Sequence, residues 1–494
     1  MTTIAAGNHK QIYFDHLDDI SITPGSGGYV NFDCSSPNSE SRPVGRKIYS
    51  ETLIAIPAGS TVFAEAVGAD ATYSIVETLG PVSSTSVLEA YYPASSNTGR
   101  RAIVGSAAPY AEYQSDGSYW VPVVMPRQME MTAWYKAAMR VLSGQGQAFV
   151  AICGDSNVVG AGAGTGAKGL LAAVSGSPAS QLASWLTAKG LPASDNSFFG
   201  EHLIQAYQST NASAWDTRFA LIGTATYYPN GAQSSFGGIM WQLNGAGEGV
   251  SYTPNITYDT VKIWYCNRTT GSFTVSNPGG GSSAGTVTTT AAAQTIGTST
   301  ISVTRGTGVC NIERASGDNW IIGAVFYDSQ TPRVNILNGG CYGESMTSTN
   351  GPANNTNEWR AGAVMAAMGL DLAIIDETLN SYPNGTAGVS AFSTALSTVC
   401  SDVTGSGANL ILATPQAVGT ANQGTVSDAY IAAIRSKAAA LGVPVADNYA
   451  RLTPYATYSS SMGFADGTTL HMNAVGYRAK AVEFGRIMLE YAGL

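Results

Sequence analysis

Charge is scarce in this sequence. Only 12 % of its 494 residues are charged, Lys and Arg form no cluster, and the formal net charge is −9. An acidic surface repels the phosphates of nucleic acids and of anionic membranes, so we expect neither as a partner. No stretch reaches the ~18 apolar residues that cross a bilayer. The opening MTTIAAGNHK lacks a basic segment followed by an apolar one, so no secretory signal is expected.

Metal-binding patterns are missing as well. The cysteines form no CxxC pair and have no histidine neighbour that would suggest a metal site. We expect most of them to be buried thiols. Cys266 and Cys310 fall in one β-rich region, and the sequence leaves a disulfide between them open. The cysteines are Cys34, Cys153, Cys266, Cys310, Cys341 and Cys400.

Small and uncharged polar residues take the place of charge. Gly occurs 57 times, and Ala, Ser and Thr are abundant. Such a surface suits extracellular or virion β-structures, and neutral carbohydrate is a compatible partner. A chain of this length is expected to hold two or three domains.

Two stretches have a β-rich pattern. Residues 1–126 alternate short apolar segments with Gly, Pro, Ser and Asn, which predicts an N-terminal region of antiparallel β-structure. We expect this region to serve attachment or oligomerisation. Residues 226–327 show a similar pattern of strands and turns, which predicts an inserted antiparallel β-sandwich.

The remaining segments, 127–225 and 328–494, alternate helices with buried strands. A helical period runs from Met131 to Leu142 and stops at Gly144, and the continuously apolar AFVAIC follows. The same alternation returns late in the chain and predicts a parallel sheet with helices on both faces. Helices are expected near 359–368, 391–399, 428–441 and 473–491, and strands at LDLAIID, NLILATP and VPVADNY.

Ser156 follows the first buried strand of this pattern. In AICGDSNVVGAG it comes after a glycine that permits a tight turn and before a segment able to start a helix. Loops at the carboxyl ends of parallel strands bind ligands, so the hydroxyl is placed to meet a substrate. A helix N-terminus also favours a developing negative charge. The alternative is that Ser156 only caps the helix.

A serine nucleophile needs a base, and histidine is rare in this chain. His9 and His16 lie in the N-terminal β-region and His202 in an expected helix, so we interpret them as surface or packing residues. His471 lies in FADGTTLHMNAVGY, a loop before the last helix. Asp466 in this loop is placed to accept a bond from the second ring nitrogen. A helix-entry histidine beside a turn aspartate is the alternative.

Acyl transfer also needs donors aimed at the oxyanion. VNILNGGCYGESM is an apolar strand followed by Gly339, Gly340 and Gly343, where the backbone can turn and present an N–H group. LDLAIIDETLNSY ends a strand near Asn380, whose side-chain amide is a second donor.

Taken in chain order, the four segments that contain Ser156, Gly343, Asn380 and His471 resemble the four blocks of the SGNH (GDSL-like) hydrolases, a family of esterases and lipases. GDSN with Ser156 matches the nucleophile block, and NGGCYGES places the oxyanion glycine at Gly343. TLNS stands where the family has Gly-x-Asn-Asp, so Asn380 carries over with changed neighbours. DGTTLHMNAVGY resembles the Asp-x-x-His block, but the longer spacing between Asp466 and His471 leaves a backbone carbonyl as an alternative partner of the imidazole.

The resemblance implies an α/β fold of the SGNH-hydrolase (flavodoxin-like) type. This is a three-layer parallel sheet, here with the inserted sandwich and the N-terminal β-rich region added. The resemblance also implies that the reaction needs no metal or cofactor and that five residues are catalytic. The residues are Ser156, His471, Asp466, Gly343 and Asn380.

The layout with an inserted sandwich is similar to that of carbohydrate deacetylases of phage tail spikes and fibres. We therefore expect a serine esterase that removes O-acetyl groups from a bacterial surface polysaccharide, either O-antigen or capsule. Its expected setting is a virion tail acting outside the bacterial cell, as a homotrimer attached to other tail proteins.

Two other functions stay open. The first is a non-catalytic glycan-binding adhesin, in which Trp241, Trp264 and Trp320 would stack on sugar rings rather than belong to a core. The second is a bacterial esterase unrelated to phage, acting on another acetylated polysaccharide or on lipid.

Overall fold

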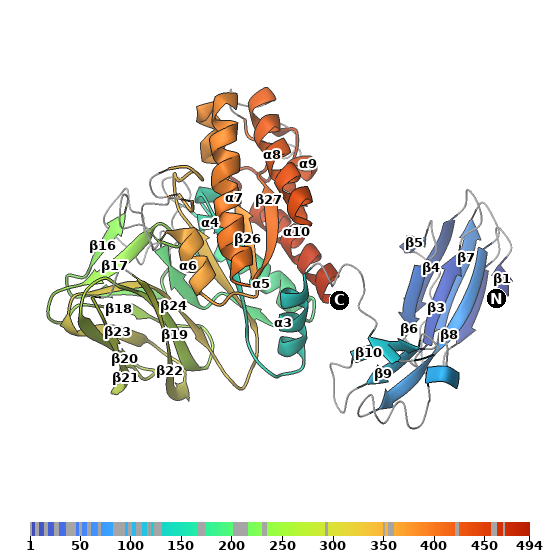
Figure 1. Ribbon diagram of the computed structural model, residues 1–494, viewed down its shortest axis with the longest axis horizontal. Coiled ribbons are helices and arrows are strands. Elements are labelled where there is room, and N and C mark those ends of the chain that lie inside the picture. The colour runs from blue at the N-terminus through green and yellow to red at the C-terminus, as the bar shows by residue number, and fades with distance from the viewer. Residues whose placement is uncertain are drawn as a thin grey trace. The chain divides into compact units, whose positions relative to one another are not determined.

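The fold is taken from a computed structural model, which divides into two compact units, Met1–Met125 and Pro126–Leu494 (Figure 1). In the first unit it describes the secondary-structure elements given below. In the second it describes residues 131–165, 173–200, 216–229, 235–291, 295–348, 351–353, 360–419, 424–455, 462–467 and 470–494.

The first unit is the β-rich region expected from the sequence. One sheet has the order β11-β10-β9-β8-β3-β6, with β1 beside β8, and the other has the order β2-β7-β4-β5. The pairing of β8 with β9 is parallel, and the other described pairs are antiparallel. The elements are β1 (Thr2–Ile4), β2 (His9–Tyr13), β3 (Asp18–Thr23), β4 (Tyr29–Ser35), β5 (Arg46–Ile48), β6 (Thr52–Ile56), β7 (Thr61–Val67), β8 (Ala71–Val82), η1 (Ala94–Ser96), β9 (Arg101–Val104), β10 (Ala111–Ser115) and β11 (Trp120–Pro122).

A parallel sheet forms the centre of the second unit and confirms the predicted α/β fold. Its order is β13-β25-β12-β26-β27-β28, and every described pair in it is parallel. β12 lies inside the sheet, and its apolar side chains belong alternately to the cores on the two faces, as its unbroken apolar run requires. The strands are β12 (Ala148–Gly154), β13 (Ala193–Ser194), β25 (Val334–Gly340), β26 (Leu372–Asp376), β27 (Asn409–Thr414) and β28 (Val445–Asp447).

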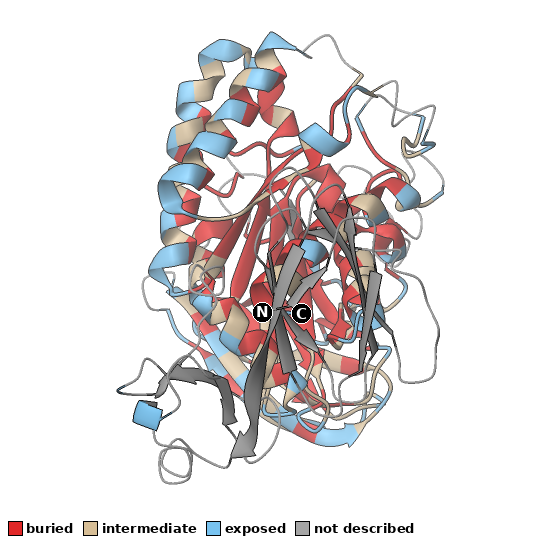
Figure 2. Ribbon diagram, turned by 90° about the vertical axis from the view of Figure 1, so that its right-hand side faces the viewer, coloured by how far each residue is buried: buried red, intermediate tan, exposed pale blue. Residues whose placement is uncertain are grey.

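Helices cover both faces of this sheet (Figure 1). One core joins the sheet to α3, α5 and α10, and a second core joins its other face to α6, α7 and α8. Figure 2 shows the buried residues concentrated in the strands and on the inner sides of these helices. The helices are α3 (Thr132–Leu142), α4 (Ser156–Val159), η3 (Ala173–Gly176), α5 (Pro178–Ala188), α6 (Ala361–Ala367), η6 (Leu379–Asn384), η7 (Thr386–Gly388), α7 (Val389–Gly405), α8 (Thr425–Leu441), α9 (Asn448–Arg451) and α10 (Ala474–Ala492).

The inserted β-structure is a sandwich of two antiparallel sheets. One has the order β16-β17-β24-β19-β22, with β14 beside β24, and the other has the order β15-β18-β23-β20-β21. An apolar core fills the space between them. The strands are β14 (Ser197–Phe199), β15 (Phe219–Ile222), β16 (Thr226–Pro229), β17 (Ile239–Leu243), β18 (Gly249–Tyr252), β19 (Tyr258–Asn267), β20 (Gly271–Ser276), β21 (Ser283–Thr289), β22 (Thr295–Gly306), β23 (Cys310–Gly317) and β24 (Asn319–Tyr327).

The sandwich begins earlier in the chain than the predicted residue 226. β14 and β15 both lie ahead of that residue, yet they pair with β24 and β18 of the sandwich. Strands this short carry little periodicity of their own, so only their pairing with distant strands identifies them.

The sheet that contains β24 packs on both of its faces. Trp241 faces the core between the two sandwich sheets, whereas Trp264 and Trp320 belong to the core shared with the parallel sheet and α6, α7 and α8. All three indoles are buried. They are therefore core residues, and stacking of these rings on sugar is excluded.

Cys266 and Cys310 are both buried and are not joined to each other, so the disulfide left open by the sequence is not formed. The side chain of Cys34 lies outside the described residues. Among the parts of the chain that the structure describes, no helix combines the length and the apolar character needed to span a membrane.

Candidate active site

Ser156 stands at the carboxyl end of β12, an inner strand of the parallel sheet. Gly154 ends that strand, and a Cβ atom on it would overlap the carbonyl oxygen of Asp376, so the close approach of the two strands requires glycine. Asp155 caps α4, because its carboxylate accepts the N–H of Asn157 at 2.8 Å. Ser156 is the first residue of α4. The alternative that Ser156 serves as the cap is therefore wrong.

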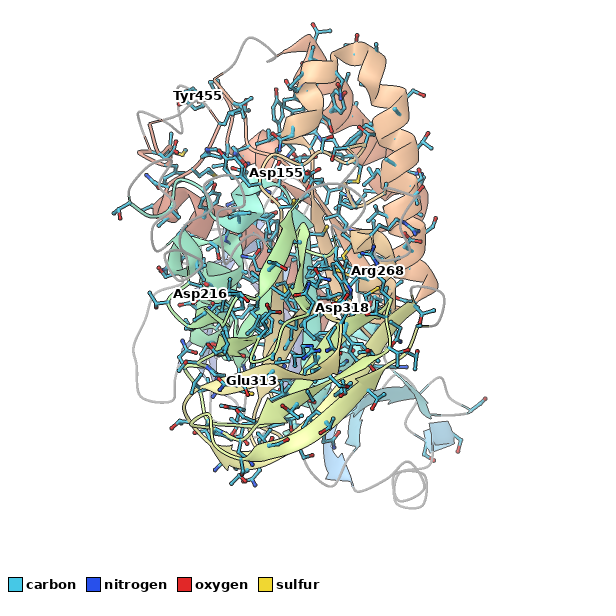
Figure 3. All side chains as sticks on the ribbon, turned by 90° about the vertical axis from the view of Figure 1, so that its left-hand side faces the viewer. Asp155, Asp216, Arg268, Glu313, Asp318 and Tyr455 are labelled. Carbon is cyan, nitrogen blue, oxygen red and sulfur yellow. The ribbon has the colours of Figure 1, made fainter. Side chains whose placement is uncertain are left out.

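His471 meets Ser156 at this end of the sheet. Its Nε2 lies 2.9 Å from Ser156 Oγ, although the two residues are 315 positions apart in the chain. Both residues are buried, with 6 % and 7 % exposed. A nitrogen at this distance can take the proton of the hydroxyl. Figure 3 shows Asp155, the neighbour of Ser156, well apart from Glu313 of the sandwich.

Asp466 lies beside the imidazole but farther than a hydrogen bond reaches. Its Oδ2 is 3.9 Å from His471 Nδ1, an ion-pair distance. The loop is held by the backbone, since the N–H of Asp466 donates to the carbonyl oxygen of His471 at 3.3 Å and the N–H of Asn473 donates to that of Phe464 at 2.8 Å. Asp466 also packs on the nucleophile segment, because a Cβ on Gly162 would lie 2.7 Å from its Oδ2.

The two predicted oxyanion donors lie on adjacent loops that touch. Gly343 follows β25 with a φ of +79°, a backbone conformation that favours glycine. Asn380 lies on η6, just after β26, and its Nδ2 donates to the carbonyl oxygen of Glu344 at 2.6 Å. An amide carries two N–H groups, so this bond leaves a second donor. Gly339 and Gly340 are the last residues of β25 and are part of the strand.

Carboxyl groups gather beneath this site. Burial raises the pKa of the Asp155 carboxyl, and it raises the pKa of Asp376, where the nearby Lys480 ammonium opposes the shift. Burial raises the pKa of Glu377 well above its ordinary value, and the neighbouring Asp155, Glu344 and Asp376 raise it further. Among the described residues no group of three or more His, Cys, Asp and Glu side chains is arranged to hold a metal ion.

The polar side chains behind the Ser–His pair were not predicted from the sequence. Asn157, Gln416 and Lys480 are buried and linked by hydrogen bonds. Gln416 comes soon after β27, at the same end of the sheet as Ser156 and Asn380. A polar residue placed just after a buried parallel strand is the signal that could have identified it.

The interpretation of the other three histidines as surface or packing residues falls on side chains outside the described ones. His9 lies in β2 of the first unit, and nothing of its side chain is described. His16 and His202 lie outside the described residues.

Comparison with solved structures shows the fold. A peptidoglycan O-acetylesterase matches with a TM-score of 0.55 at 14 % sequence identity, over 73 % of this chain and 96 % of the other. An acetyl xylan esterase matches with a TM-score of 0.26 and 15 % identity over 31 % and 79 % of the two chains. A family two carbohydrate esterase from Clostridium thermocellum, in complex with cellohexaose, has a TM-score of 0.26 and 11 % identity over 54 % and 99 %.

The first of these likenesses shows a shared fold, and the two lower TM-scores do not establish one. No protein-family model matches the sequence. No curated protein matches it significantly.

Proposed function

We propose that this protein is a serine esterase that removes O-acetyl groups from a carbohydrate. The observation that carries the proposal is the 2.9 Å contact between Ser156 Oγ and His471 Nε2 at the carboxyl ends of the parallel strands. The activity of the structure with the shared fold, a peptidoglycan O-acetylesterase, agrees with this chemistry.

The first half of the reaction forms an acetyl-enzyme. Ser156 Oγ attacks the acetyl carbonyl carbon while its proton passes to His471 Nε2. The tetrahedral intermediate collapses by breaking the bond to the sugar oxygen. His471 returns the proton to that oxygen, and the sugar leaves as an alcohol.

The second half regenerates the enzyme. Water attacks the acetyl carbonyl as His471 takes its proton. The bond to Ser156 Oγ then breaks, the proton returns to this oxygen, and acetate leaves. The negative charge that develops on the carbonyl oxygen in both halves would be met by the N–H groups of Ser156 and Gly343 and by the amide of Asn380. Donors of this kind are each worth about 10²- to 10³-fold in rate.

The chemistry of the surface favours a neutral polysaccharide substrate. The formal net charge of −9 disfavours a polyanionic partner. We further propose that the substrate is an O-acetylated polysaccharide of the bacterial surface and that the protein works as a trimeric phage tail component. This finer proposal is supported by the sequence layout and composition.

Acetate release tests the proposal. The wild-type protein should hydrolyse p-nitrophenyl acetate, and Ser156→Ala and His471→Ala should each lower kcat by about 10³-fold or more. Ser390→Ala is the matched control, because Ser390 is an exposed residue of α7. Acetate released from a panel of purified surface polysaccharides then identifies the substrate.

Two outcomes would refute parts of this proposal. Full activity in Ser156→Ala would show that Ser156 is not the nucleophile. Activity on p-nitrophenyl acetate without acetate release from any bacterial polysaccharide would support the esterase activity and contradict the proposed substrate.

A further inference from the structure

Gln416 bridges the two loops that carry the Ser–His pair. Its Nε2 donates to Asn157 Oδ1 at 2.8 Å and to the carbonyl oxygen of Leu470 at 2.9 Å. Asn157 follows Ser156 in the chain, and Leu470 precedes His471. Gln416 is fully buried, with 0 % exposed. One side-chain amide therefore ties the immediate neighbours of the nucleophile and of the base.

A buried ion pair determines which way this amide faces. Lys480 Nζ donates to Gln416 Oε1 at 3.4 Å and lies 2.5 Å from Asp376 Oδ2. An ammonium group can only donate, so it requires the amide oxygen on its own side. The N–H groups of Gln416 then face the two loops. Lys480 and Asp376 are almost fully buried, at 1 % and 2 % exposed.

The polarity of Asn157 agrees with this arrangement. Its Nδ2 donates to Asp155 Oδ1 at 2.9 Å, which leaves Oδ1 as the acceptor for Gln416. The single hydroxyl proton of Tyr477 is shared between the carbonyl oxygen of Ala161, 2.5 Å away, and Asn157 Oδ1, 3.2 Å away. Donors and acceptors alternate without conflict from the ion pair to the nucleophile segment.

Burying an ion pair contributes little net stability compared with apolar residues of similar volume. We propose that Gln416, oriented by Lys480 and Asp376, is a positioning residue that keeps Ser156 Oγ and His471 Nε2 at hydrogen-bond distance. The inference rests on the proposed esterase function. A displacement of about 1 Å in such a pair can cost about 10²-fold in rate.

Gln416→Glu tests the inference with little change of volume. A carboxylate can accept from Lys480 but cannot donate to Asn157 or Leu470. We expect kcat for p-nitrophenyl acetate, measured below the unfolding transition, to fall about 10- to 100-fold with KM close to that of the wild type, and the midpoint of thermal unfolding to fall because a carboxyl is buried against two acceptors. Gln330→Glu is the matched control, because Gln330 is exposed on the turn after β24, and its kcat should be unchanged.

A double-mutant cycle separates positioning from a general structural effect. If Gln416 acts through His471, Gln416→Glu should not lower the residual rate of His471→Ala any further. An equal loss in both backgrounds, or an unchanged kcat in the single variant, would overturn the inference. If Gln416→Glu does not fold, the neutral Gln416→Met takes its place, and loss of the fold in both would show that the amide is only structural.

The two proposals fail in different ways. Full activity in His471→Ala would reject the proposed function itself. Loss of activity in His471→Ala together with full activity in Gln416→Glu would reject only the positioning role.

Discussion

The sandwich and the carboxyl end of the parallel sheet bury opposite kinds of side chain. Between the sandwich sheets, Phe198, Tyr252 and Phe326 lie with ring centroids 5.0 to 6.2 Å apart, in an apolar core. Beneath Ser156 the chain instead buries carboxyl groups around one ammonium. They belong to Asp155, Asp376, Glu377 and Lys480.

The two regions therefore serve different purposes within one folded unit: the sandwich core contributes stability, and the site beside Ser156 contributes catalysis. Burial of apolar surface stabilises the sandwich, by about 25 cal/mol per Å². Burial of charge at the site costs free energy, and it persists where it orients reacting groups. Variants in the sandwich should therefore change the free energy of unfolding, and variants at the site should change kcat.

The largest expected effect is on stability and lies in the sandwich. Trp241→Ala removes a fully buried indole and should lower the free energy of unfolding by about 3–5 kcal/mol. Below the unfolding transition its kcat for p-nitrophenyl acetate should equal that of the wild type. Urea unfolding and steady-state kinetics check the two halves of this prediction. A large loss of kcat in the folded variant would contradict the claim that sandwich residues affect stability and not catalysis.

Asn380 should give the next largest effect, and on rate rather than stability. Asn380→Ala removes an oxyanion donor and should lower kcat by about 10²-fold or more, with an unchanged urea midpoint. Asn384→Ala is the control, because Asn384 is exposed on the same short helix η6. Similar kinetics for the two variants would show that Asn380 is not an oxyanion donor.

A smaller rate effect is expected at Asp466. Its carboxylate lies 3.9 Å from His471 Nδ1, so it acts as a nearby charge, and Asp466→Ala should lower kcat about 10-fold. A hydrogen-bonded aspartate of a catalytic triad is worth about 10⁴-fold. Steady-state kinetics that show a loss near that size would establish a direct bond during turnover.

A pH-dependent change in stability is expected at Glu377. Burial raises the pKa of this carboxyl in the folded state above its ordinary value of 4.5. The folded state therefore holds the proton more tightly, and the associated stability is lost as the pH rises from about 4.5 through the raised pKa.

The amide introduced by Glu377→Gln stays neutral throughout this pH range. The variant and the wild type should unfold at similar urea concentrations near pH 4, and the variant should be the more stable one near pH 8, by more than about 1.4 kcal/mol, the equivalent of one pKa unit. Urea titrations at the two pH values test this. A difference that is constant across this range would contradict the buried, protonated carboxyl.

Much of the fold could be predicted because its patterns are local. The unbroken apolar runs of β12, β26 and β27 indicate strands covered on both faces, and the helical period from Met131 to Leu142 identifies α3. The ends of parallel strands share one edge, so the residues after them could be expected to meet. Ser156 and Asn380 were predicted in this way, whereas Gly343 was selected among the three glycines of its segment by the resemblance to the SGNH hydrolases.

The remaining features depend on contacts between distant residues. The membership of β14 and β15 in the sandwich follows from pairing with β24 and β18, and no local pattern encodes it. The separation of Asp466 from the imidazole is set by the shape of one loop. The roles of Gln416 and Lys480 arise only when three separate segments are packed together.

Covalent trapping of the nucleophile tests the central claim most directly. A fluorophosphonate should form an adduct on the peptide that contains Ser156, as located by mass spectrometry, and labelling should be at least about 10³-fold slower in His471→Ala, which lacks the base. An adduct on a different residue, or labelling of Ser156 that is equally fast without His471, would contradict the claim that these two side chains form one catalytic pair.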